Sequence, residues 1–282
     1  MRRWHLIEIE DLPFLPTSVR NLLTDVLAFL STRLKIYRPV LPLLEDVLVK
    51  MGTRRIIDLC SGAAGPWPKL LDDGLDVSVT LTDKYPNLDA MRLAQRQHPE
   101  RITIREDPVD ARALPADCAG VCTMFNGFHH FPPAEAKAIL QSLVQRRKAI
   151  AVFEITEASP RIFLSVLCVP ILMLLITPWL RPLTWERLFW TYLIPLAPLC
   201  LLWDGLVSML RIYSQQDLQQ LAAATDSPGY AWKTGRLTPP FPGLPITYLI
   251  GYPQAEEQSR QQDVPTAEAS TATTPQSETA NT

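Results

Sequence analysis

The residue types best suited to chemistry gather first in one stretch, Ile56–Gly65. An apolar run of strand type passes there into a turn of very small residues and then into a helical pattern. Because such a turn carries almost no side-chain bulk, a ligand can lie directly against its backbone. The stretch therefore predicts a ligand-binding loop. Its candidate residues are Asp58, Cys60, Ser61, Gly62 and Gly65.

Two more acidic residues follow the next two apolar runs. Asp83 comes directly after the run Val77–Thr82, and Asp110 stands beside Ala111 after the run Ile102–Arg105. The carboxyl ends of parallel strands meet at one rim of a sheet. If these runs are such strands, Asp83, Asp110 and Ala111 lie on the same rim as the small-residue loop and are further candidates for ligand binding.

This arrangement of acids and small residues resembles the cofactor site of class I S-adenosylmethionine-dependent methyltransferases. The resemblance implies that Asp58 faces the methionine end of the cofactor, that Asp83 binds the ribose hydroxyls and that Asp110 faces the adenine amine. Cys60 and Ala64 stand at two positions where the family has glycine. Both replacements are small, so close approach of a ligand to the backbone is still expected.

The same loop also fits a second cofactor class. With Cys60 in the first glycine position it reads as the fingerprint of a nicotinamide dinucleotide site, and that site would also use an acid at Asp83. Asp58 and Asp110 favour the methyl donor, because the dinucleotide motif has no counterpart for Asp110 and its first strand is usually apolar where Asp58 stands. The NAD(P)-dependent oxidoreductase remains the alternative.

A polar segment follows the fourth apolar run, Gly120–Phe125, and resembles the methyltransferase segment after strand four. Its candidate catalytic residues are Asn126, His129 and His130. Asn126 could bind substrate or cofactor, and either histidine could take a proton, because imidazole titrates near neutral pH. The alternative is that the aromatic residues and His130 pack around the cofactor and do no proton chemistry. Two adjacent histidines without a defined third ligand predict no metal site.

The resemblance limits what the protein has to supply. A sulfonium methyl donor carries its own leaving group, so the main tasks are to align donor and acceptor and to exclude water. A base is needed only if the acceptor begins protonated. The sequence therefore identifies the cofactor better than the catalyst, and it does not identify the acceptor.

Short apolar runs alternate with helical patterns from Arg54 onwards, which predicts a parallel sheet covered on both faces. The expected fold is α/β, a doubly wound, mostly parallel seven-stranded sheet with N-terminal helices as a lid or edge layer. Strands are predicted at Arg55–Leu59, Val77–Thr82, Ile102–Arg105, Gly120–Phe125, Ala149–Ile155, Tyr230–Leu237 and Ile246–Tyr252. Helices are predicted at Pro68–Asp73, Asn87–Gln97, Pro133–Val144 and Leu218–Ala224.

A strongly apolar insertion interrupts this pattern after the fifth strand. Ile162–Leu180 and Leu188–Trp203 carry no charge. A helix from Ile162 to Thr177 would be about 24 Å long, short of the roughly 30 Å hydrocarbon layer, and Pro170 would kink it. Since the chain must return to the sheet, it crosses a membrane twice or not at all. We therefore expect a membrane-associated or re-entrant helical hairpin; the alternative is a lid or dimer interface in a soluble enzyme.

Polar and aromatic residues flank the insertion in the way that suits a membrane interface. The basic residues are Arg161, Arg181 and Arg187, and the aromatic ones are Trp179, Trp185, Trp190, Tyr192 and Trp203. The expected partners are thus a membrane, through residues 162–203, and a small-molecule or lipid-like substrate. The expected location is the cytoplasmic face of a membrane.

These elements divide the chain into five parts. They are an N-terminal helical segment (1–53), the cofactor-binding α/β core (54–158), the apolar insertion (159–212), the C-terminal part of the core (213–253) and a disordered tail (254–282). The tail has too few apolar residues to offset the entropy of ordering it. Truncation after Pro253 is expected to leave stability and cofactor binding unchanged.

The composition argues against nucleic-acid binding and against export of the protein. The formal net charge is −2, and no basic cluster of the size that nucleic acid needs is present. The 5 cysteines are odd in number and scattered, which predicts reduced thiols in a cytosolic setting. Acidic residues stand where a signal peptide has its apolar region, so cleavage for export is not expected. A non-catalytic interaction protein with this fold is the third hypothesis.

Overall fold

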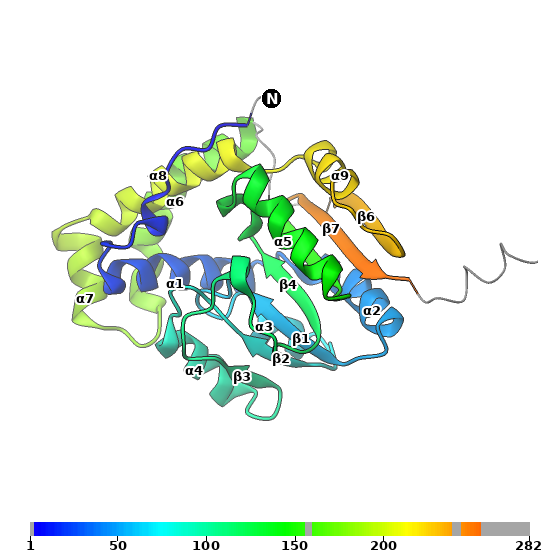
Figure 1. The fold of residues 1–282 in the computed structure, drawn as a ribbon. Coiled ribbons are helices and arrows are strands. Elements are labelled where there is room, and N and C mark those ends of the chain that lie inside the picture. Colours follow the sequence, from blue (N-terminus) through cyan, green and yellow to red (C-terminus); the bar gives the residue numbers. More distant parts are fainter. Residues whose placement is uncertain (1–2, 156–159, 239–243, 255–282) are drawn as a thin grey trace, which may run out of the picture.

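The computed structural model describes residues 3–155, 160–238 and 244–254, and it contains a seven-stranded sheet in the order β3-β2-β1-β4-β5-β7-β6 (Figure 1). The strands are β1 (Arg55–Leu59), β2 (Ser78–Leu81), β3 (Ile102–Ile104), β4 (Val121–Phe125), β5 (Ile150–Ile155), β6 (Tyr230–Leu237) and β7 (Ile246–Pro253). Strands β1 to β5 are parallel, whereas β7 runs antiparallel to both β5 and β6. The predicted doubly wound, mostly parallel seven-stranded sheet is confirmed. The sequence-based strand bounds agree with it to within one or two residues.

Helices cover both faces of this sheet because alternate strand residues point to opposite sides. The helices are α2 (Leu41–Lys50), α3 (Trp67–Asp72), α4 (Leu88–Gln97), α5 (Pro133–Gln145) and α9 (Gln215–Ala223). Helices α2, α3 and α4 share one apolar cluster with Ile56. Helices α5 and α9 share the other with Ile57. The tail prediction falls on residues outside the described ones, except for Gln254.

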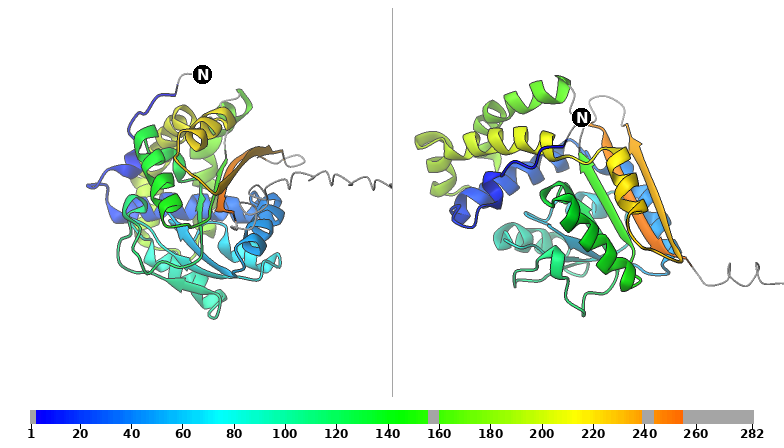
Figure 2. Two further views of the ribbon diagram at one scale, coloured as in Figure 1. Left: turned by 45° about the vertical axis from the view of Figure 1, so that its right-hand side comes forward. Right: turned by 45° about the horizontal axis from the view of Figure 1, so that its top comes forward.

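A second group of helices lies beyond one end of the sheet, on the side of the carboxyl ends of the parallel strands (Figures 1 and 2). It comprises α1 (Thr17–Arg33), α6 (Pro160–Ile176), α7 (Trp185–Leu188) and α8 (Leu196–Arg211), with the short turns η5 (Thr177–Trp179) and η6 (Phe189–Leu193). Helices α6 and α8 pack together as a hairpin. They approach closely at Gly205, where an added Cβ would lie 2.9 Å from a methyl carbon of Val166.

One side of the hairpin packs on α1. Leu22 and Val26 of α1 lie in one apolar cluster with Met173 of α6 and Leu201 of α8. Helix α1 is held on the rim in turn by Asn87, whose side-chain amide donates hydrogen bonds to the Asp25 carboxylate at 3.0 Å and to the Thr24 hydroxyl at 3.1 Å. The N-terminal helices are therefore divided, with α1 over the rim and α2 against a face of the sheet.

Candidate active site

The loop after β1 has the backbone of a glycine-rich turn, although only part of it is glycine. Four of its residues have positive φ, namely Cys60 (59°), Gly62 (51°), Ala64 (71°) and Gly65 (48°). Residues with a side chain rarely adopt this left-handed conformation, and such strain concentrates at functional sites. Cys60 and Ala64 thus keep the conformation that glycine would have at the positions where the family resemblance expects it. Burial raises the pKa of the Cys60 thiol well above its usual value, so the thiol stays neutral.

Asp58 lies beneath this loop rather than on its surface. It is buried, and its two carboxylate oxygens accept hydrogen bonds from the hydroxyls of Thr123 (2.6 Å) and Ser61 (2.7 Å). Burial raises its pKa to about 7, against the opposing effect of these two donors. Asp58 therefore ties β1 to β4 and to its own loop, and Ser61 is occupied in the same contact.

Asp83 joins the loop to the end of β2. Its carboxylate accepts hydrogen bonds from the backbone amides of Gly62 and Tyr85, each at 2.7 Å. Burial raises its pKa above the usual value. A carboxylate has about four acceptor sites, so two contacts leave acceptor capacity for further hydroxyl donors. Asp83 is thus placed to bind a diol and to hold the loop at the same time.

Asp110 lies farther out on the same rim and caps the short turn η3 (Ala111–Ala113). Its carboxylate is paired with the guanidinium of Arg112 at 2.5 Å, and this hydrogen bond lowers the pKa of Asp110. Ala111 packs into the apolar cluster on the α5 side of the sheet. An adenine amine that reached Asp110 would share its carboxylate with Arg112.

The segment after β4 contacts the loop after β1. Asn126 has a φ of 51°, and its side-chain oxygen accepts a hydrogen bond of 3.2 Å from the amide of Ile155. A Cβ added to Gly127 would lie 2.8 Å from the Cβ of Cys60. The three rim segments predicted from sequence, after β1, β2 and β4, are therefore in contact with one another.

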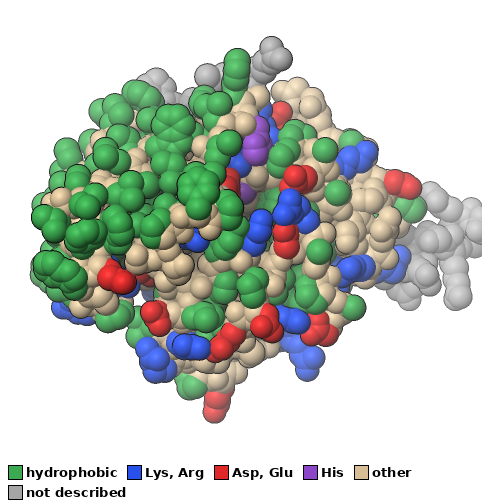
Figure 3. All heavy atoms as spheres, turned by 60° about the vertical axis from the view of Figure 1, so that its left-hand side comes forward, with side chains coloured by type: hydrophobic (Ala, Val, Ile, Leu, Met, Phe, Trp, Pro, Cys, Tyr) green, Lys and Arg blue, Asp and Glu red, His purple; other side chains and the backbone are tan. Residues whose placement is uncertain are grey.

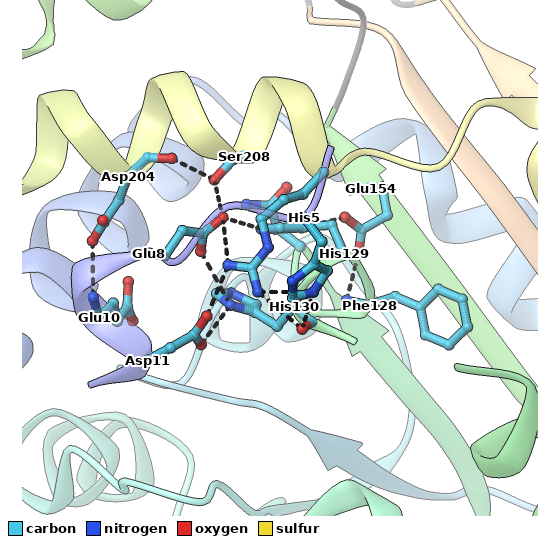
Figure 4. Close-up of polar contacts among 12 residues, drawn as sticks. His5, Glu8, Glu10, Asp11, Phe128, His129, His130, Glu154, Asp204 and Ser208 are labelled. Carbon is cyan, nitrogen blue, oxygen red and sulfur yellow. Dashed lines mark hydrogen bonds and ion pairs between the residues drawn. The ribbon is translucent and has the colours of Figure 1, made fainter. Parts of the chain in front are cut away.

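His129 is held by a carboxylate that lies within β5 (Figure 4). Its Nδ1 lies 2.6 Å from Oε2 of Glu154, whose Oε1 accepts a hydrogen bond of 2.7 Å from the amide of Phe128. This contact favours the tautomer with the proton on Nδ1 and leaves Nε2 as the proton acceptor. Nε2 faces Oε1 of Glu8 at 3.7 Å, and both His129 and Glu8 are buried.

His130 stacks on His129, with 4.4 Å between ring centroids, but its surroundings differ. Its Nδ1 lies 2.9 Å from Asp11 and 3.1 Å from Glu8. Burial alone would lower the pKa of His130, but the opposing charges of Glu8 and Asp11 outweigh it and raise the pKa to about 10. His130 therefore carries a proton at neutral pH. The two ring nitrogens of His129 face Glu154 and Glu8 instead.

Several residues of this cluster come from distant parts of the sequence. Arg211, at the end of α8, is buried and contacts Glu8 at 3.1 Å and Asp11 at 2.7 Å. Glu8 and Asp11 lie about two hundred positions away from it in the sequence. Sequence reasoning missed all three, together with Glu154. The available signal for Glu154 was a carboxylate inside an otherwise apolar strand.

The sequence predicted no metal site because the two histidines had no third ligand beside them, and Glu8 is such a residue. Glu8, His129 and His130 each offer a ligand atom, and these atoms lie within 4.8 Å of one another. The guanidinium of Arg211 and the proton on His130 already place positive charge against the carboxylates. The prediction of no metal stays a prediction.

An apolar surface adjoins the cluster. Figure 3 shows hydrophobic side chains gathered over the upper left of the view, with histidine side chains at the edge of this region. Among the described residues, one helical stretch, Ile162–Trp179, is long and apolar enough to cross a membrane, and only 11% of it is buried. The bent pair Trp185–Leu193 and Leu196–Arg211 would also qualify if it formed a single span.

The polar flanks of this surface only partly follow the prediction. Trp179, Trp185, Tyr192 and Trp203 are exposed, whereas Trp190 donates a hydrogen bond to Ser18. Arg187 does not face outward, because its guanidinium pairs with Asp25 of α1 at 2.5 Å. The side chain of Arg161 lies outside the described residues.

Among known proteins, the similarity found is to solved structures. No protein-family model matches the sequence, and no curated protein matches it. An O-methyltransferase family protein from Burkholderia thailandensis is 16% identical, with 83% of this chain and 60% of that chain covered and a TM-score of 0.47. A candidate O-methyltransferase from Nostoc punctiforme is 12% identical, with 87% of this chain and 63% of that chain covered and a TM-score of 0.49. Magnesium protoporphyrin IX methyltransferase from Synechocystis, solved with S-adenosylhomocysteine, is 14% identical, with 86% of this chain and 89% of that chain covered and a TM-score of 0.42.

The chain spans about three fifths of the length of the first two of these structures. The decisive feature of the architecture is its own topology, in which an antiparallel β7 is inserted between β5 and β6. The chain has a class I methyltransferase fold. Dinucleotide-binding folds of the doubly wound type instead follow the order 3-2-1-4-5-6.

Proposed function

We propose that the protein transfers a methyl group from S-adenosylmethionine to a hydrophobic or membrane-resident acceptor. One observation carries the cofactor assignment, namely the loop Cys60–Gly65, with four left-handed residues, held against the Asp83 carboxylate on a sheet in which β7 lies between β5 and β6. A bare backbone turn beside a carboxylate with acceptor capacity left suits a ligand that carries a ribose.

The rim residues fit this cofactor. Gly62 and Gly65 would let it approach the loop, Asp83 would accept hydrogen bonds from its ribose, and Asp110 with Ala111 would lie near the adenine. Asp58, which the resemblance places at the methionine end, would act through Ser61 and Thr123 by fixing the shape of the loop. When bound, the cofactor supplies an electrophilic methyl group with a neutral thioether as leaving group.

Calorimetry with S-adenosylhomocysteine and with NADH tests the assignment. The expected result is binding of S-adenosylhomocysteine and none of NADH. The reverse result would favour the oxidoreductase, which the position of β7 between β5 and β6 already disfavours. Binding of S-adenosylhomocysteine without methyl transfer to any component of lipid or protein extracts would favour the non-catalytic interaction protein.

His129 is the candidate base for an acceptor that begins protonated. Glu154 orients its ring and stabilises the imidazolium that forms when Nε2 takes a proton. His130 is already protonated at neutral pH and would contribute positive charge instead. Asn126, in its strained turn beside Cys60, would contact the cofactor or the acceptor from the β4 side.

We further place the protein on the cytoplasmic face of a membrane, with residues 162–203 as the docking segment. An apolar helix that is exposed on most of its surface is costly in water but not at a bilayer. Leu175→Glu on α6, where Leu175 is 65% exposed, is expected to move the full-length protein from the membrane pellet towards the soluble fraction. Val49→Glu, at a position 67% exposed on α2, is the matched control and should leave fractionation unchanged.

Wild-type protein that stays soluble without detergent and sediments with no membrane would overturn this placement. A dimer under the same conditions would identify the apolar surface as a subunit interface instead. Neither result bears on the cofactor, which is tested separately by calorimetry.

A further inference from the structure

The N-terminal strap, defined as Arg3–Leu15, covers the histidine pair. Its Glu8 carboxylate faces both His129 and His130, and its Asp11 carboxylate contacts His130 (Figure 4). His129 is buried under this contact and against Glu154 and His130. The proposed proton acceptor, Nε2 of His129, is thus closed off by Glu8, and no acceptor molecule can reach it until the strap moves.

Polar contacts to α8 and to the segment after β4 hold the strap in place. The backbone amides of Ile9 and Glu10 donate to the two carboxylate oxygens of Asp204, at 2.6 Å and 3.0 Å. The indole of Trp203 donates to the carbonyl of Ile7 at 3.0 Å. Buried ion pairs of Glu8 and Asp11 with Arg211 and His130 hold it as well, and movement of the strap has to replace them with other partners, because a buried charge left unpaired is costly.

The far end of the strap is anchored by apolar packing. Leu15 is buried in the cluster that α1 shares with α6 and α8. Ile9 packs, partly buried, against the same cluster, whereas the part from Arg3 to Glu8 is held by polar contacts and ion pairs. The part that covers the histidines lies outside α1.

The outer side of the strap is apolar. Leu6, Ile7 and Phe14 point away from the cluster and are 41%, 64% and 78% exposed. The hydrogen bond from Trp203 to Ile7 places Ile7 directly beside the exposed face of α8. The strap and the α6–α8 hairpin consequently present one continuous apolar surface, with carboxylates on the inner side of the strap and hydrophobic side chains on the outer side.

A bilayer interface fits this surface better than a protein partner does. The stretch Ile162–Trp179 is uncharged and apolar on nearly all sides, whereas a helix that docks on a protein needs one apolar face only. Exposed tryptophans at Trp179, Trp185 and Trp203 suit the headgroup level of a membrane. The occupant argued for is therefore a lipid surface.

We propose that the strap is a membrane-operated gate over His129. Insertion of Leu6, Ile7 and Phe14 into the lipid interface draws Glu8 and Asp11 away from the histidine pair, so the site opens on the side from which a membrane-resident acceptor arrives. This inference rests on the membrane docking and acceptor class proposed above. It does not depend on the identity of the cofactor.

Hydrogen exchange on the full-length protein tests the gate without a known acceptor. The protein is compared in detergent-free buffer and bound to vesicles of phosphatidylcholine and phosphatidylglycerol, and the amides of Ile9 and Glu10 report on the strap. On vesicles these amides are expected to exchange at least about tenfold faster, while α6 becomes protected. Ile7→Asp should abolish the acceleration although the protein still binds through α6 and α8. The matched control Val49→Asp should retain it.

Two results would overturn the gate. Bound protein whose Ile9 and Glu10 amides exchange no faster than in buffer would make the strap a fixed cover, and membrane docking itself would stand. Absence of vesicle binding, or formation of a dimer or protein complex in its place, would remove the lipid surface as the occupant. Failure to bind S-adenosylhomocysteine in calorimetry would instead contradict the proposed methyl transfer. It would not affect the interpretation of the hydrogen-exchange experiment.

Discussion

The Asp83 carboxylate accepts a 2.7 Å hydrogen bond from the amide of Gly62, so the end of β2 directly holds the loop after β1. Asp83→Asn replaces a charged acceptor by an amide at the proposed ribose site. Affinity for S-adenosylhomocysteine is expected to fall about ten- to a hundredfold, which corresponds to roughly 1.5–3 kcal/mol. Calorimetry measures the change.

The matched control is Asp76→Asn, an exposed acid that precedes β2 at the opposite end of the strand and pairs with Arg101. It should leave cofactor affinity unchanged. Because Asp83 also supports the loop, the melting temperature of both variants is recorded alongside. A folded Asp83→Asn protein with wild-type affinity would contradict the assignment.

Removal of the imidazole at His129 separates proton transfer from cofactor binding. His129→Ala is expected to retain affinity for S-adenosylhomocysteine and to lose at least about tenfold in turnover, with the loss in kcat rather than KM. The assay follows transfer of labelled methyl groups from S-adenosylmethionine to cell lipid extracts. Glu154→Gln should lower turnover in the same direction, since the amide holds the ring but stabilises the imidazolium less. Full turnover in both variants would leave alignment of donor and acceptor as the sufficient mechanism.

The loops after β1 and β4 meet at Cys60 and Gly127, and this contact can be measured as a coupling. Gly127→Ala would place a Cβ 2.8 Å from that of Cys60, so unfolding free energy should fall. Cys60→Gly removes the opposing Cβ at a position whose φ of 59° suits glycine. The double variant should therefore recover part of the loss, with a coupling of about 1 kcal/mol in a denaturation cycle. Strict additivity would show that the two loops relax independently.

Stability should fall as the pH rises from 8 to 10. The charges of Glu8 and Asp11 raise the pKa of His130 to about 10 in the folded protein, against an ordinary value near 6.5. A raised pKa means that the folded state holds the proton longer, so the contribution is complete below about pH 6.5 and is lost on approach to pH 10. The loss is at most about 1.4 kcal/mol per pH unit.

Denaturation of wild type and His130→Gln at pH 8, 9 and 10 isolates this effect. Burial also raises the pKa of Asp58 to about 7 and that of Glu10 to about 8. Their titration likewise lowers stability as the pH rises, but it does so below this pH range. The variant should show the flatter dependence. Equal slopes in the two proteins would mean that His130 is not protonated in the folded state.

Local sequence determined most of the sheet and its rim. Short apolar runs separated by helical patterns specify strands and crossovers, and the crossovers bring the carboxyl ends of the parallel strands to one side. Asp58, Asp83, Asp110 and Asn126 therefore reach the same rim whatever the rest of the chain does. The small size of Cys60 and Ala64 was enough to predict that a ligand can approach the backbone of the loop, because that property depends only on the residues of the loop itself.

Tertiary structure alone decided what surrounds each histidine. His129 and His130 are adjacent in the sequence, but His129 faces Glu154 and Glu8, whereas His130 faces Glu8 and Asp11. Glu8 and Asp11 reach them from the N-terminus, and Arg211 joins from the end of α8. Electrostatic interactions depend on distance in space and on burial, and neither is written in the spacing of residues along the chain. The sequence could therefore place the rim, whereas the charge on each histidine and the strap that closes over it followed only from the packing of α8 and the N-terminus against the sheet.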